Sequence, residues 1–145
     1  VIHTLDLAMG VFNKSSVVIE LAVFLCFIRI AIYDFKNHLI RNIDLLIVAI
    51  FAFPLYWRNW WIASANLSIY SFIWLINKGK LGVGDVYLSF FCALLCPSFQ
   101  VLCYSTGIAW ILGGISSLRD PKKAIPFAPF MIGGSYLAIF LVPTG

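Results

Sequence analysis

Charged residues are scarce in this 145-residue chain, where Asp, Glu, Lys and Arg together make up 11% of the sequence. An ordinary soluble domain carries about a quarter. Only six residues are acidic, whereas 62% are hydrophobic. This composition excludes a typical soluble enzyme and indicates a helical protein that crosses a membrane several times. Internal repeats, low-complexity segments and linkers are also missing, so we predict one membrane-embedded domain over residues 1–145.

Cysteine motifs and targeting signals are missing too. All four cysteines lie in apolar runs, without a CxxC pair or a histidine cluster: Cys26, Cys92, Cys96 and Cys103. The sequence therefore offers no basis for a zinc site or a disulfide framework, and we predict neither a metal nor a cofactor. We expect the four thiols to be small buried hydrophobic side chains. No stretch has the pattern of a cleaved signal peptide, so we expect insertion to rely on the first apolar segment.

Six apolar segments separated by short polar turns make up most of the chain. They cover residues 16–33, 43–57, 60–77, 86–96, 99–118 and 125–142. A straight crossing needs about 20 residues, so the second segment and above all the fourth are short. We nevertheless predict an all-α polytopic membrane protein with about six transmembrane helices, one for each apolar segment.

The basic residues indicate how these segments are oriented. If all six cross, one face holds the loops that contain Lys36, Arg41, Lys78, Lys80, Arg119, Lys122 and Lys123. The opposite face holds Lys14 and Arg58, while Arg29 lies inside the first segment. This bias follows the positive-inside rule, which places the first group in the cytoplasm. The net charge of +4 therefore indicates topology and contact with membrane lipid, and we predict no nucleic-acid partner.

Aromatic residues mark the outer turn between the second and third segments. The stretch "YWRNWW" at residues 56–61 holds three tryptophans around one arginine. Tryptophan and tyrosine are enriched where a membrane meets water, so this turn is predicted to lie in an interfacial belt.

Two aspartates stand at the cytoplasmic ends of apolar segments. Asp34 follows the first segment, and Asp85 precedes the fourth behind Gly82 and Gly84. Only the tertiary fold could bring the two together, but neighbouring carboxylates would share a proton, so that one could act as base and the other as acid. The glycines would let backbone approach closely. A helix start is the alternative interpretation of Asp85, because an acid after a glycine turn is typical of a helix N-terminus.

Three ordered elements resemble the type 4 prepilin peptidases, the GxGD aspartic membrane proteases of bacteria. The elements are "YDFKNHLIRN", "GVGD" and "IPFAPF". The matching residues are Asp34, Lys36, Ile40 and Asn42 in the first element, Gly82, Gly84 and Asp85 in the second, and Pro126 and Pro129 in the third. The resemblance covers residues 16–142 and includes the six-span layout, without the cytoplasmic CxxC insertion of the larger enzymes.

This resemblance implies a membrane aspartic endopeptidase with Asp34 and Asp85 as its catalytic pair and no metal or cofactor. It implies cleavage of the leader peptide of type IV prepilins or pseudopilins, at the cytoplasmic face of the bacterial inner membrane. Three residues depart from the family's pattern: Arg41 replaces a proline, Tyr87 a lysine and Ala128 a glycine. Because the CxxC insertion is linked to methylation, we expect cleavage without assigning methyl transfer. Neither the substrate nor the oligomeric state can be read from these residues.

Two other functions remain open at this point. The chain could be a catalytically inert relative that acts as a membrane assembly partner, or a small proton-coupled transporter with Asp34 and Asp85 as its proton relay. Three further polar residues have more ordinary interpretations. Asp44 is predicted to cap the second helix or to interact with its dipole. His38 is either a solvated loop residue or a second proton carrier, and Arg29 either reaches the interface or lies near Asp34.

Overall fold

A computed structural model describes residues 2–77, 81–119 and 125–142, and each regular element in these ranges is helical. In chain order the elements are α1 (Ile2–Asn37), α2 (Asn42–Tyr56), the 3-10 turn η1 (Trp57–Asn59), α3 (Trp60–Ile76), α4 (Val83–Leu94), α5 (Phe99–Arg119) and α6 (Ala128–Leu141). The predicted all-α class is confirmed.

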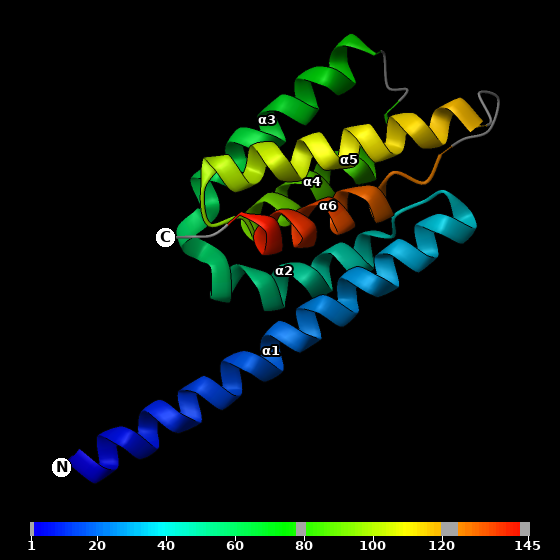
Figure 1. Cartoon of the computed structure of the whole chain (residues 1–145). Coiled ribbons are helices and arrows are strands. Elements are labelled where there is room, and N and C mark those ends of the chain that lie inside the picture. The colour runs from blue at the N-terminus through cyan, green and yellow to red at the C-terminus, as the bar shows by residue number, and fades with distance from the viewer. Residues whose placement is uncertain (1, 78–80, 120–124, 143–145) are drawn as a thin grey trace.

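Three helical stretches of the described chain are long and apolar enough to cross a membrane. They are Ser16–Asn37, Asn42–Ile76 and Phe99–Leu118. The second joins α2, η1 and α3, and the chain turns at η1 (Figure 1). By contrast, α4 and α6 have 12 and 14 residues. Their lengths of about 18 and 21 Å are shorter than a hydrocarbon core of about 30 Å. The described residues thus hold three candidate spans, fewer than the six crossings predicted.

Several helix ends differ from the predicted segment ends. α1 includes Asp34 and continues to Asn37, and it begins well before residue 16. α4 begins at Val83 rather than at residue 86, and α6 begins at Ala128 rather than at residue 125. The reason is that hydropathy marks where side chains are apolar, whereas a helix ends where its backbone hydrogen bonds end. As a consequence, both aspartates lie inside helices rather than beside them.

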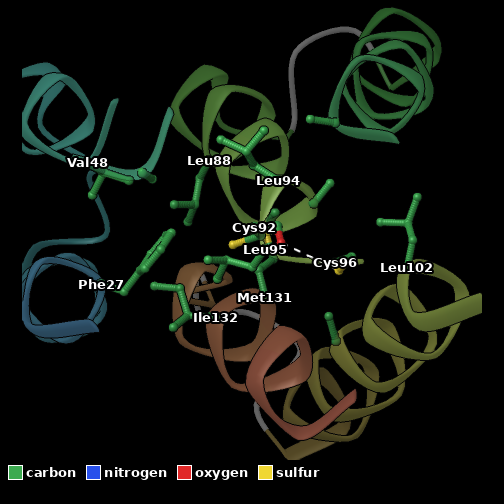
Figure 2. Close-up of a cluster of buried hydrophobic side chains, with 14 of the residues drawn as sticks. Phe27, Val48, Leu88, Cys92, Leu94, Leu95, Cys96, Leu102, Met131 and Ile132 are labelled. Atoms are coloured by element: carbon green, nitrogen blue, oxygen red, sulfur yellow. Dashed lines mark hydrogen bonds between the residues drawn. The ribbon is translucent and has the colours of Figure 1, made fainter. Parts of the chain in front are cut away.

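The core forms around α4, which packs against α2, α3 and α6. Figure 2 shows its apolar side chains meeting those of neighbouring helices. Leu88, Leu94 and Cys96 are fully buried there, as are Phe27 of α1 and Val48 of α2. Helices in a bilayer gain little from leaving lipid, so close van der Waals packing of this kind holds such a bundle together.

Small residues bring α5 and α6 into close contact. A Cβ atom on Gly134 would lie 2.6 Å from the backbone oxygen of Ser105. The hydroxyls of Ser105 and Ser135 form a 2.9 Å hydrogen bond across the same interface. Small residues and buried hydroxyl pairs are typical of helix contacts inside membranes, which agrees with the composition of the chain.

The four thiols have different environments. Cys92 in α4 and Cys96, two residues after the end of α4, are buried, as predicted. Cys26 is only partly buried, and Cys103 is exposed. The expectation of burial was wrong for Cys103, because an apolar stretch of sequence does not reveal which side of a helix faces its neighbours.

The two ends of the bundle differ in character. At one end the chain turns through η1, where Trp57, Trp60 and Trp61 are each more than half exposed. Trp60 and Trp61 stack with their ring centroids 5.4 Å apart. These exposed rings agree with the predicted interfacial belt. At the opposite end lie the end of α1 and the beginnings of α2 and α6 (Figure 1).

Candidate functional site

Asp34 lies in the last turn of α1 with only 4% of its surface exposed. Its Oδ2 atom accepts a 3.0 Å hydrogen bond from the backbone N–H of Ala128. Ala128 is the first residue of α6, where a backbone N–H has no partner within its own helix. The positive end of the helix dipole also favours a negative charge at this position. The start of α6 therefore orients the Asp34 carboxylate.

Gly84 brings α4 against the loop that follows Asp34. A Cβ atom on Gly84 would lie 2.8 Å from the Cβ atom of Ile40, closer than two side chains can approach. Ile40 belongs to the connection between α1 and α2. The missing Cβ thus lets the first turn of α4 contact the segment that carries the first aspartate.

Asp85 is the third residue of α4, partly buried and outside the three stretches long enough to span a membrane. Burial, and to a lesser extent the negative charge of Asp34, raise the pKa of Asp85 to about 7. A hydrogen bond from the backbone N–H of Gly82 lowers this pKa. Two carboxylates that interact in this way titrate as a coupled pair.

The helix-start interpretation of Asp85 is also partly supported. Gly82, not Asp85, is the N-cap residue of α4. The Asp85 carboxylate nevertheless reaches back toward it, because a Cβ atom on Gly82 would lie 3.0 Å from Asp85 Oδ2. An acid at this position satisfies a free N–H of the first turn. Asp85 can serve the helix start and the carboxylate pair at the same time.

The other predicted site residues lie around this pair without a hydrogen bond to either carboxylate in the described part of the chain. Lys36 and Asn42 are exposed at the end of α1 and the beginning of α2. Pro126 and Pro129 are partly buried on either side of the α6 start. Proline suits the first turn of a helix, where its missing N–H costs nothing.

Several of the basic residues used to predict topology lie outside what the structure describes. These are Lys78, Lys80, Lys122 and Lys123, together with the side chains of Lys14 and Arg119.

A charged cluster beside the site was not anticipated. Asp44 is 3% exposed. It accepts hydrogen bonds from Arg41 at 2.9 and 3.0 Å. The Nε atom of Arg29 lies 3.4 Å from its Oδ1 atom. Arg29 therefore pairs with Asp44 rather than with Asp34. The N-cap residue of α2 is Arg41, so the capping role predicted for Asp44 is wrong. Its position in the first turn still suits the helix dipole.

Arg41 connects the two sides of the turn after Asp34. Besides binding Asp44 in α2, its guanidinium lies 4.7 Å from the ring centroid of Tyr33 in α1. A cation over an aromatic face is attracted to it. These contacts hold the turn that follows Asp34. The sequence signal that could have predicted the Arg41–Asp44 pair is an arginine three residues before an aspartate.

His38 directly follows α1 and has a left-handed backbone conformation, with φ 51°. Its backbone N–H donates a 2.8 Å hydrogen bond to the carbonyl oxygen of Asp34. The residue is exposed, which agrees with the loop interpretation.

Comparisons with known proteins identify no relative: no family model, no curated protein and no solved structure matches the chain. The functional argument therefore depends on the residues and their geometry.

Proposed function

We propose that this chain is a membrane aspartic endopeptidase in which Asp34 and Asp85 form the catalytic pair. The electrostatic effect of the buried Asp34 on Asp85 supports the proposal. The observation that carries it is a pair of contacts, from Ala128 to Asp34 and from Gly84 to Ile40. They join the same three sequence elements that resemble the prepilin peptidases.

The chemistry follows from giving the two carboxylates different protonation states. Asp34, which accepts the Ala128 N–H, is the ionised base. Asp85, whose pKa burial raises to about 7, carries the shared proton. Asp34 takes a proton from water as the water oxygen bonds to the peptide carbonyl carbon, and Asp85 protonates the carbonyl oxygen. When the gem-diol collapses, the C–N bond breaks, a carboxylic acid forms and the leaving nitrogen gains a proton from Asp34, while Asp85 recovers its own.

The substrate class rests on the motif resemblance. We propose that the substrate is the leader peptide of a type IV prepilin or a pilin-like secretion subunit, cut at the cytoplasmic face of a bacterial inner membrane. Six crossings are part of the proposal. A helix as short as α4 can cross if the bilayer thins around it, and thinning would bring water closer to Asp85.

Co-expression of the full chain with a candidate prepilin tests the proposal. Asp34→Asn and Asp85→Asn should each abolish the gel shift that reports leader removal, while the variants remain membrane-inserted. Glu20→Gln is the matched control, because Glu20 is an exposed acid on α1 away from the pair. Normal processing by either Asn variant would refute the proposal.

The same experiment distinguishes an inert relative. If the wild type cleaves no prepilin, yet its deletion impairs secretion and the Asn variants restore it, the chain is a membrane assembly partner instead.

A further inference from the structure

Two shallow apolar grooves lie along the last turns of α1 and share two lining residues. The first has a volume of about 320 Å³ and is lined by Leu25, Ile28, Arg29, Ile32, Tyr33 and Lys36. The second has a volume of about 260 Å³ and is lined by Ala31, Ile32, Phe35, Lys36 and Pro129. Both grooves include Ile32 and Lys36, so one ligand with two apolar arms could occupy them together.

Arg29 in the first groove shares its carboxylate partner with a second cation. The Asp44 carboxylate is bound by Arg41 through two hydrogen bonds and contacts Arg29 at 3.4 Å, which leaves two guanidinium groups around one carboxylate. The Arg29 side chain is 59% exposed. Lys36 is exposed seven residues later, two turns along the same face of α1.

We propose that this face of α1 binds a diacyl anionic phospholipid. Its phosphate lies at Lys36, which lines both grooves, and the Arg29 guanidinium extends toward it from the first groove, while one acyl chain runs from there along each groove. Charge complementarity selects an anion that both Lys36 and Arg29 can reach. The two apolar grooves that meet at Ile32 select two hydrocarbon chains attached to one headgroup. The stretch Ser16–Asn37 is long and apolar enough to span a membrane, which places lipid beside it. This inference does not depend on the proposed peptidase activity.

Native mass spectrometry of the purified full chain in a neutral detergent provides the test. The probes are phosphatidylglycerol and phosphatidylcholine with identical acyl chains. The wild type should retain phosphatidylglycerol preferentially. Each basic residue near an anionic lipid surface strengthens binding on the order of fivefold, so Arg29→Gln and Lys36→Gln should each reduce the preference by about that factor. Arg58→Gln is the matched control, since Arg58 lies in the η1 turn and its loss should leave the preference unchanged.

The remaining arms test the form of the ligand. Single-chain lysophosphatidylglycerol should bind more weakly than the diacyl lipid, and inorganic phosphate should not displace the lipid. Circular dichroism checks that each variant keeps its helical content. If a variant does not fold, the preference of the wild type for phosphatidylglycerol over phosphatidylcholine is the test of the proposal. Equal retention of the two headgroups by the wild type, an unchanged preference in both groove variants, or displacement by inorganic phosphate would overturn the proposal.

Discussion

Asp34 and Ala128 are 94 positions apart in the chain, yet a 3.0 Å hydrogen bond joins the carboxylate of one to the backbone N–H of the other. The bond connects the end of α1 to the start of α6. It uses an N–H that every helix start leaves free, so the side chain at position 128 is not what holds the aspartate. The alanine at this position supplies the donor through its backbone.

The first prediction concerns this bond. Asp34→Ala and Asp34→Asn both remove the charge, but only asparagine retains an oxygen that can accept the Ala128 N–H. We expect the alanine variant to have a free energy of unfolding lower than that of the asparagine variant by about 1–3 kcal/mol, because it leaves a buried donor unpaired. Reversible denaturation in detergent micelles measures the difference. Equal stability of the two variants would show that the bond contributes nothing.

A second prediction concerns the approach of α4 to the loop. Gly84→Ala should destabilise the protein by about 1–3 kcal/mol, because its new methyl group would overlap Ile40. If the proposed function holds, it should also reduce cleavage by displacing Asp85. Gly107→Ala in α5 is the matched control, since a Cβ there meets nothing within 4 Å. The control should be neutral or stabilising by up to about 1 kcal/mol. Similar behaviour of the two variants would contradict the packing argument.

The pH dependence of stability follows from Asp85. Its pKa in the folded protein is about 7, above the value of 3.8 for an unperturbed aspartate. The folded state therefore binds this proton more tightly than the unfolded state. The resulting stabilisation is fully present below about pH 4 and is lost as the pH rises through 7, at no more than about 1.4 kcal/mol per pH unit.

Asp85→Asn isolates this contribution, because the variant does not titrate at position 85. The free energy of unfolding of the wild type minus that of the variant should fall between pH 4 and pH 7. Denaturation curves at three pH values are sufficient. A difference that stays constant, or that grows with pH, would mean that Asp85 is not held in its neutral form by the fold.

The fourth prediction tests whether the short helices cross the membrane. Single cysteines in a cysteine-free background can replace Leu39, Arg58 and Pro97, all of which are exposed in the structure. If α2 crosses, a membrane-impermeant thiol reagent should label positions 39 and 58 from opposite sides. If α3 and α4 both cross, position 97 should be labelled from the same side as position 58. Labelling of position 97 from the side of position 39 would contradict six crossings.

Much of the fold follows from local patterns. Long apolar runs are enough to predict helices, because backbone groups in a membrane must be satisfied within the segment. The order of those runs predicted the sequence of helices from α1 to α6. Their ends were less predictable, since hydropathy alone does not show that α4 begins before its apolar run and takes Asp85 into its first turn.

The amino-acid sequence by itself determined the all-α class, the apolar segments and the two aspartates that stand out among so few charges. Only the tertiary structure decided what those aspartates contact. It joined Asp34 to the start of α6 and coupled Asp85 to Asp34. It also placed the Asp44 carboxylate in contact with the guanidinium groups of Arg41 and Arg29. Helix formation depends on neighbours three or four residues away, whereas these contacts depend on how whole helices pack, which no local pattern records.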